Sequence, residues 1–459
     1  MALFWKREVT GLVSLTLAGV LLITFVPLAA PEDRSALLEQ IDAIVEETMA
    51  RDQIVGTSVG VHRRGEVLLA KGYGYADLEN QVRATEHTVF RIGSITKQFT
   101  AAAILILEER DRLRLSDPLT EFLPDYETTG HHISVERLLN HTSGIKGYTE
   151  MGEKFWGKSR LDLSHEEMVE LFSAEPFQFA PGEEYSYNNS AYYLLGLIIE
   201  KVSGKSYADF LQENLWTPLG MRESHYLYND PIVPNRAEGY EVQDGEVVND
   251  APLSMRLPFS AGSLGSSVMD LITWQHALSN ERLLSGESYS KMTTPGTLTS
   301  GKKLDYGFGL SVGELSGRRK ISHGGGINGF RTQLAYYPED ALTVVVLCNT
   351  GAAQPSPLES RIARAVLGIP ETPVEEVTLG EDELRKYAGN YNPARAPFEV
   401  RLVDGALTLF GSRLRPVGNH LFFPVSDDYQ KITFELSGDQ VVALRMEREG
   451  QTMEAPRVP

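Results

Sequence analysis

The feature that most constrains the fold is an almost uninterrupted apolar segment, Phe99–Leu107, which follows a serine and a lysine. A helix made from this segment is apolar on nearly every side, so the segment predicts a helix buried at the centre of a domain. Ser94 and Lys97 stand three residues apart at its start, where their side chains share one face. The free N–H groups and dipole of a helix N-terminus favour negative charge. Burial lowers the affinity of a lysine for its proton, so Lys97 is a plausible proton acceptor for Ser94.

The spacing of this pair is weak evidence by itself. The same spacing recurs in three other pairs, Ser143/Lys146, Ser288/Lys291 and Ser300/Lys303. Those pairs lie in glycine-containing or short polar segments, whereas Ser94 opens the apolar helix. On the motif alone, a Ser/Thr-rich helix start with a solvated lysine is the simpler interpretation.

Two further short motifs point to the same chemistry. Tyr187 is the only tyrosine followed two positions later by asparagine, Asn189, and it precedes a predicted helix at 191–202. His323 is the only histidine followed two positions later by glycine, Gly325, in a glycine-rich segment that leads into a strand. Glycines there let a ligand or another backbone approach closely. Taken singly, Tyr187 reads equally well as loop packing and the glycines as a flexible turn.

The order of the predicted elements indicates an α+β fold. Strand-like runs occur at 56–61, 66–70, 329–337 and 342–348, with helix-like runs at 36–50 and 358–367. Residues 94–290, between the two groups of strands, are dominated by helical patterns and loops. We therefore predict an antiparallel sheet flanked by terminal helices, with a mainly helical insertion, in a domain spanning 36–368. A cleft where the two parts meet is the natural place for an active site.

The composition changes after this domain. Residues 369–383 are rich in Pro, Thr and Glu and predict a linker. From residue 384 to 459 the chain alternates between short apolar runs and turns, at 398–403, 407–410, 421–425, 432–436 and 441–446. This pattern predicts a small, barrel-like all-β domain.

The N-terminal 1–30 segment has the layout of an export signal. Lys6 and Arg7 precede an almost charge-free stretch, Thr10–Ala30, which ends in small residues. The stretch is also about long enough to cross a bilayer, which takes roughly 20 residues. We expect a signal peptide or membrane anchor, and a periplasmic or extracellular protein that is free or tethered to the membrane.

Composition excludes several classes of partner and cofactor. The formal net charge is −19, which repels phosphate backbones, so nucleic acid is not expected as a partner. The single cysteine, Cys348, excludes an intramolecular disulfide framework and a cysteine-rich zinc site. It lies in a β-branched run and is expected to be a core residue. No motif indicates a metal or an organic cofactor.

Taken together, the three motifs resemble those of class C β-lactamases, D-alanyl-D-alanine carboxypeptidases, D-aminopeptidases and related esterases. That superfamily carries S-x-x-K, Y-x-N and K/H-x-G, here Ser94–Lys97, Tyr187–Asn189 and His323–Gly325. Three surrounding segments are also typical of it, Phe90–Lys97, Leu138–Gly144 and Ala261–Gly265. The resemblance covers about residues 36–368. The C-terminal domain resembles a lipocalin-like module found in some members.

The resemblance implies a role for each motif residue. Ser94 would be the nucleophile, with Lys97 and Tyr187 sharing the general base and acid work. Asn189 would bind the substrate amide. The backbone N–H groups of Ser94 and Gly326 would form the oxyanion hole. His323 and Gly325 would complete the substrate-binding wall.

The residue at position 323 departs from true β-lactamases, which carry lysine there in K-T-G. Histidine is mostly neutral at neutral pH, which weakens a cationic clamp on a substrate carboxylate. An unperturbed histidine titrates near pH ~6.5, so the protonation of His323 is expected to influence turnover. The departure favours a peptidase or esterase over an efficient β-lactamase.

The sequence therefore predicts a serine hydrolase that forms an acyl-enzyme on Ser94. Its substrates would be small molecules or peptides with amide or ester bonds: D-amino-acid peptides, peptidoglycan fragments, small esters or β-lactams. The alternative is a catalytically slow sensor that binds penicillin or cell-wall fragments in the same pocket. A sensor would keep the label of a fluorescent penicillin, and an enzyme would release it.

Overall fold

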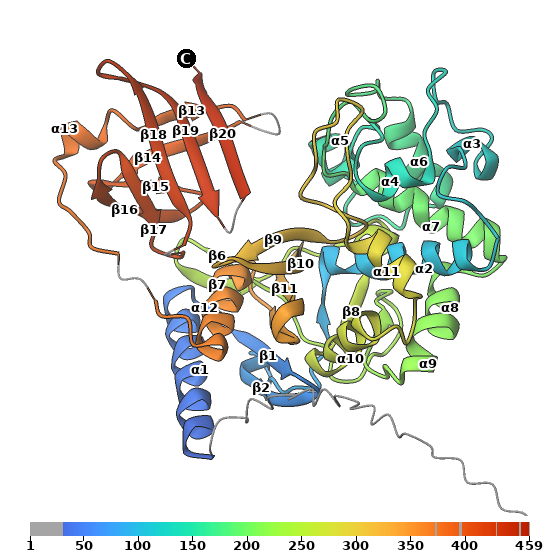
Figure 1. The fold of residues 1–459 in the computed structure, drawn as a ribbon, viewed down its shortest axis with the longest axis horizontal. Coiled ribbons are helices and arrows are strands. Elements are labelled where there is room, and N and C mark those ends of the chain that lie inside the picture. The colour runs from blue at the N-terminus through green and yellow to red at the C-terminus, as the bar shows by residue number, and fades with distance from the viewer. Residues whose placement is uncertain (1–30, 372–373, 394–396, 428, 449–450, 459) are drawn as a thin grey trace, which may run out of the picture.

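The computed structural model describes residues 31–371, 374–393, 397–427, 429–448 and 451–458. A mixed α+β domain and a C-terminal barrel stand side by side in it (Figure 1). The export signal or anchor predicted for residues 1–30 lies outside the described residues. Among the described helices, none is both long enough and apolar enough to cross a bilayer.

The core of the α+β domain is a seven-stranded antiparallel sheet in the order β3-β2-β1-β12-β11-β10-β9. Its strands are β1 Gly56–Arg63, β2 Glu66–Asp77, β3 Val82–Arg83, β9 Ser311–Leu315, β10 Arg318–Ile327, β11 Phe330–Tyr337 and β12 Leu342–Cys348. Pairing of β1 with β12 joins the two ends of the domain, as predicted. The sequence did not predict β9 and β10. The glycines at 324–326 are therefore part of a strand and not a turn leading into one.

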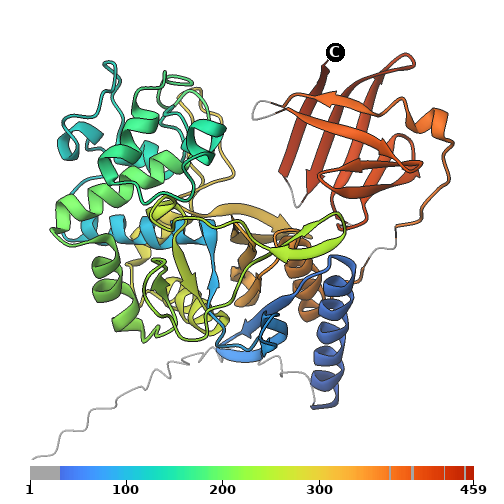
Figure 2. The same ribbon diagram turned by 180° about the vertical axis from the view of Figure 1, so that it is seen from behind.

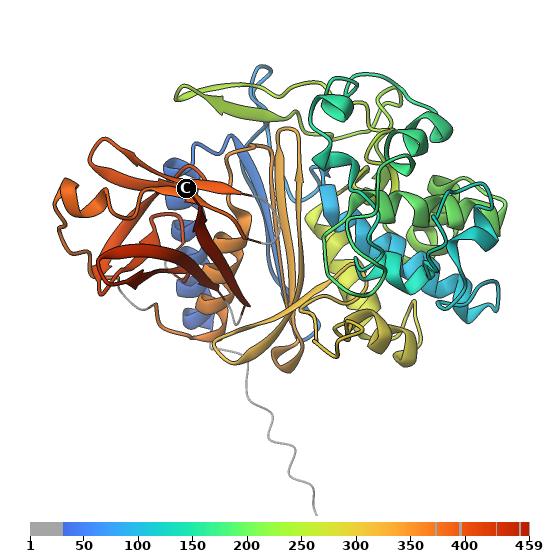
Figure 3. The same ribbon diagram turned by 90° about the horizontal axis from the view of Figure 1, so that it is seen from above.

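Helices cover both faces of this sheet (Figure 3). Along β12, Val344 and Val346 pack with α1 Pro31–Arg51 and α12 Pro355–Leu367 on one face. Val345 and Leu347 face the opposite core, which includes the helical insertion. This alternation is the period of two expected for a strand buried on both faces.

The insertion holds the buried helix predicted from Phe99–Leu107. It is α2, Thr96–Glu109, and every residue from Thr96 to Leu107 is buried. Phe99 stacks on Trp274 with ring centroids 4.0 Å apart. A single 3-10 turn, η1 Gly93–Ile95, precedes α2 and carries Ser94, so the serine lies just outside the α-helix.

The remaining helices of the insertion surround α2. They are α3 Leu119–Phe122, α4 Val135–Leu139, α5 Glu153–Trp156, α6 His165–Ser173, α7 Asn189–Ser203, α8 Tyr207–Leu211, α9 Thr217–Leu219, α10 Val268–Ser279 and α11 Gly286–Thr293. Helix α7 ends at Gly204, whose left-handed φ of 72° provides the predicted stop. Short strands pair as β4 Phe90–Arg91, β8 Leu264–Ser266 and β5 His225–Tyr226, and as β6 Tyr240–Gln243 with β7 Glu246–Asn249.

The C-terminal domain is a closed eight-stranded antiparallel barrel, seen from behind in Figure 2. Its strands are β13 Gly389–Tyr391, β14 Phe398–Val403, β15 Ala406–Leu409, β16 Ser412–Gly418, β17 Leu421–Pro424, β18 Lys431–Ser437, β19 Gln440–Arg448 and β20 Gln451–Val458. The sequence predicted five of them and missed β13, β16 and β20. A short helix, α13 Glu381–Leu384, precedes the barrel. Tyr387, Tyr391, Phe422 and Phe434 are among the side chains that fill its interior.

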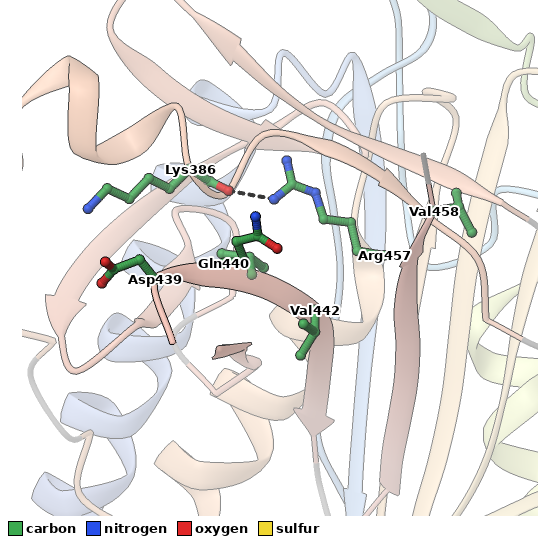
Figure 4. A pocket seen from close by; sticks show the side chains of 7 residues that line it. Lys386, Asp439, Gln440, Val442, Arg457 and Val458 are labelled. Atoms are coloured by element: carbon green, nitrogen blue, oxygen red, sulfur yellow. Dashed lines mark hydrogen bonds between the residues drawn. The ribbon is translucent and has the colours of Figure 1, made fainter. Parts of the chain in front are cut away.

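Two arginines, Arg448 and Arg364, make contacts between the barrel and the α+β domain. Arg448 of β19 donates to Ser356 Oγ at the start of α12, at 2.7 Å. Arg364 of α12 lies over the Tyr429 ring, 3.6 Å from its centroid. A separate hollow of about 540 Å³ lies on the barrel, where Arg457 donates to the Lys386 carbonyl beside Asp439 (Figure 4). It is far from the predicted motifs in the sequence and shares no residue with them.

Candidate active site

Ser94 is presented by the η1 turn between strand β4 and helix α2. Gly93 has a left-handed φ of 51°, and a Cβ built there would lie 2.9 Å from the Gly326 nitrogen. Glycine at 93 therefore allows the turn to approach β10 closely. This contact brings the first and third sequence motifs together.

Lys97 is fully buried on α2 and holds the centre of the site. Its Nζ lies 3.0 Å from Ser94 Oγ, 2.7 Å from Asn189 Oδ1 and 2.8 Å from the Ala261 carbonyl oxygen. Burial lowers the pKa of Lys97 well below its ordinary value. A neutral amine has two N–H groups, and Asn189 Oδ1 and the Ala261 carbonyl can only accept. When Lys97 is neutral, its lone pair therefore faces the hydroxyl of Ser94.

Tyr187 approaches the same hydroxyl from the loop before α7. Asn188 caps that helix by accepting from the Ala191 nitrogen at 2.8 Å, which fixes the loop. Burial raises the pKa of Tyr187 above its ordinary value, although its hydrogen bond with Ser94 works in the opposite direction. Tyr187 thus keeps its proton at neutral pH and faces Ser94 as a donor.

Asn189 is held by the site from both ends of its amide. Its Oδ1 accepts from Lys97, and its Nδ2 donates to Thr149 Oγ1 at 3.1 Å. A second Nδ2 hydrogen remains for a substrate carbonyl. The structure therefore adds an orienting contact with Lys97 to the substrate-binding role that the sequence implied.

His323 lies in the same cluster but has both ring nitrogens engaged. Its Nδ1 lies 2.6 Å from the Gly324 carbonyl oxygen, which can only accept, so Nδ1 carries the proton of the neutral ring. Its Nε2 lies 2.9 Å from Tyr306 Oη and accepts from that hydroxyl. Burial, and then the nearby Lys97, lower the pKa of His323 to about 3. The expectation that His323 titrates near pH 6.5 is therefore wrong, because burial disfavours the charged ring and any proton on Lys97 would repel it.

Gly325 and Gly326 lie where β10 has an open edge. β9 pairs with Arg318–Ser322 only, so the strand from His323 onward is uncovered on that side. A Cβ at Gly325 would lie 2.0 Å from the Ile92 carbonyl oxygen, so only glycine fits there. Gly326 is exposed beside the η1 turn, which suits a backbone donor for an oxyanion.

Comparisons with known proteins identify the family of the α+β domain. Residues 41–368 match the beta-lactamase family. The chain belongs to this family. It is 30% identical to a D-aminopeptidase of Gluconobacter oxydans (strain 621H) over 342 residues, which cover 73% of this chain and 63% of that protein. The chain thus spans less than two thirds of that relative's length.

Two solved structures extend the comparison with the beta-lactamase family. The octameric penicillin-binding protein homologue from Pyrococcus abyssi is 27% identical, with a TM-score of 0.67 over 91% of this chain and 99% of that one. The D-amino acid amidase from Ochrobactrum anthropi SV3, complexed with L-phenylalanine amide, is 25% identical. Its TM-score is 0.65 over 72% of this chain and 99% of that one.

Four residues of the site were given no role from the sequence: Thr149, Tyr306, His141 and Ala261, whose carbonyl accepts from Lys97. Thr149 holds Asn189, and Tyr306 holds His323. His141 accepts from the Asn188 nitrogen through Nδ1 at 3.0 Å, and its ring lies 4.4 Å from that of Tyr187. His141 and Ala261 had a signal, because they fall in the family-typical segments Leu138–Gly144 and Ala261–Gly265. Thr149 lies in the short 3-10 helix Tyr148–Glu150 and Tyr306 in a loop, and the positions of both depend on tertiary packing.

The low pKa of His323 predicts a pH-dependent loss of stability. Unfolded histidine gains a proton below pH ~6.5, whereas folded His323 does so only near pH 3. The unfolded state is therefore favoured as pH falls, by about 2 kcal/mol at pH 5. Urea unfolding at pH 7 and pH 5 should show that His323→Gln loses less stability than the wild type. Exposed His132→Gln is the matched control, and equal losses in the His323 variant and the wild type would contradict the prediction.

Proposed function

We propose that the protein hydrolyses amide and ester bonds of D-amino-acid derivatives through an acyl-enzyme on Ser94. The observation that carries this proposal is the position of Lys97. Its Nζ lies 3.0 Å from Ser94 Oγ, and burial lowers its pKa. A neutral lysine at hydrogen-bond distance from a serine is an activated nucleophile pair.

In the acylation step, Ser94 Oγ attacks the substrate carbonyl carbon while Lys97 accepts the hydroxyl proton. The backbone N–H groups of Ser94 and Gly326 stabilise the oxyanion. The C–N or C–O bond then breaks, and Tyr187 gives its proton to the leaving amine or alcohol. Lys97 returns a proton to Tyr187. Deacylation repeats the sequence with water as the nucleophile and Ser94 as the leaving group.

The charges around Ser94 favour substrates whose leaving group is uncharged. His323 is neutral and committed to Tyr306 and Gly324, so it offers no cation to a substrate carboxylate. Lys97 is buried and already contacts three oxygens. The leaving groups of simple D-amino-acid amides and esters carry no carboxylate, so they need no cation in the site. β-Lactams and peptides ending in D-alanine do carry a carboxylate on the leaving group. The relatives named D-aminopeptidase and D-amino acid amidase support the D-configuration.

A substrate panel tests this proposal. We expect turnover of D-phenylalanine amide and a short-chain p-nitrophenyl ester, slower turnover of L-phenylalanine amide, and little turnover of nitrocefin. A fluorescent penicillin should label the protein transiently, because water can reach the acyl-enzyme. Lasting label without turnover of any amide or ester would overturn the proposal in favour of a slow sensor.

A further inference from the structure

A polar cavity of about 180 Å³ lies behind the active-site strand, where the α+β domain meets the barrel. Its walls include Ser322 of β10, Gln333 of β11, Ser356 of α12 and Arg448 of the barrel. This cavity is distinct from the space around Ser94. Most of the residues that line it lie on the face of the sheet opposite to the one that carries the active site. Alternate side chains on a strand point to opposite faces, and Lys320 and Ser322 alternate with Ile321 and His323.

Gln333 is the clearest sign that this cavity receives a ligand. Its side chain lines the cavity and is only 5% exposed. Among the hydrogen bonds of the described residues, none involves its amide group, nor the hydroxyls of Ser311 and Ser322, which line the same cavity. Buried polar groups are nearly always hydrogen-bonded, so the unused amide of buried Gln333, with two half-buried serine hydroxyls beside it, indicates a polar partner in the cavity.

The surrounding charge favours an anion as that partner. Arg448 donates to Ser356 Oγ at 2.7 Å, and Lys320 lines the adjacent wall. Helix α12 begins here, and its N-cap, Gln354, makes no side-chain capping bond. Pro355 and Pro357 of its first turn have no N–H, so Ser356 supplies the free backbone donor among the first three helical residues, and the helix dipole also favours negative charge. Serine hydroxyls and a glutamine amide supply further donors.

The two cations also limit the charge that the cavity accepts. Lys320 pairs with Glu359 at 2.6 Å, and Arg448 pairs with Asp427 at 2.5 Å. The charges within each ion pair cancel when the cavity is empty. The affinity for an anion must therefore come from directed hydrogen bonds more than from net charge. Hydrogen bonds to an ionised acceptor are the stronger kind. A small oxyanion, with several acceptor atoms and one or two charges, meets these conditions.

We propose that this cavity binds a small oxyanion, with phosphate as the best fit, between β10, β11, α12 and the barrel. The bound anion would connect Gln333 and Ser322 of one domain to Arg448 of the other. It would also lie against Gly324, which lines the cavity and whose carbonyl accepts from His323. The anion would thus hold the barrel against the strand that carries the catalytic glycines.

The test measures binding to the full chain, so its result does not depend on which substrate the protein hydrolyses. Thermal unfolding is followed in sodium phosphate, sodium acetate and sodium chloride at equal ionic strength. Phosphate should raise Tm by about 2–4 °C at saturation, acetate less, and chloride not at all. Titration calorimetry with inorganic phosphate should give a Kd that rises about ten-fold or more in Gln333→Leu and in Ser322→Ala.

Matched variants separate the cavity from general effects of salt and substitution. Exposed Gln243→Leu and Ser300→Ala should keep the wild-type affinity for phosphate. Ser322→Ala removes one hydroxyl and leaves the barrel contacts in place, so it remains informative if Gln333→Leu fails to fold. Equal shifts in phosphate and chloride would show only charge screening and would overturn the proposal. The proposal would also be overturned if Ser322→Ala, and Gln333→Leu where it folds, bound phosphate as tightly as the wild type does.

Discussion

Ser94→Ala is expected to lower kcat by about 10⁴- to 10⁶-fold, the range for removing the nucleophile of a serine hydrolase. The variant keeps its donors for the oxyanion, so it should still bind substrate with little change in KM. It should also lose all covalent labelling by a fluorophosphonate or a penicillin. Hydrolysis of D-phenylalanine amide and in-gel fluorescence measure the two effects.

The chain supplies a matched control for this variant. Ser300 also stands three residues before a lysine, Lys303, but it lies in an exposed loop. Ser300→Ala should keep wild-type activity and labelling. Label on the Ser94→Ala protein, traced by peptide mass to another serine, would show that the nucleophile is misassigned.

Lys97→Met is expected to lower kcat/KM by about 10²- to 10⁴-fold, because it removes the general base and keeps the volume of the side chain. The same variant should change how stability depends on pH. Unfolded Lys97 binds a proton up to pH ~10.4, whereas the buried, folded lysine has a lowered pKa. The unfolded state binds more protons, so wild-type stability rises with pH relative to the variant. Urea unfolding at pH 7, 8 and 9 measures this difference.

Lys320→Met is the contrasting control. Lys320 is equally buried, but Glu359 compensates its charge at 2.6 Å. Removing it leaves a buried carboxylate without its cation, which costs about 3–5 kcal/mol. If Lys97→Met shows no pH-dependent difference from the wild type, Lys97 is charged in the folded protein and cannot be the base.

Much of the fold could be predicted from local patterns. The apolar run Phe99–Leu107 became α2, and the β-branched run at 342–348 became β12 at the predicted bounds. Both segments are buried on all sides, so an apolar run without a polar face is enough to predict that they are buried. β10 was missed because its glycines have no side chains to show a period of two. They belong to a strand because they pair with residues 331–333 of β11, and the sequence does not show that pairing.

The sequence by itself singled out Ser94, Lys97 and Tyr187 as candidates, through residue type, spacing and the helices beside them, and the structure places them together. Only the tertiary structure decided their protonation states and partners. Lys97 has a lowered pKa because it is buried, and His323 is neutral because it is buried close to Lys97, while Tyr306 and Gly324 fix its tautomer. Tyr306 lies 17 residues from His323 in the chain. Desolvation and hydrogen bonding depend on what folding places around a group, and residue spacing does not encode that arrangement.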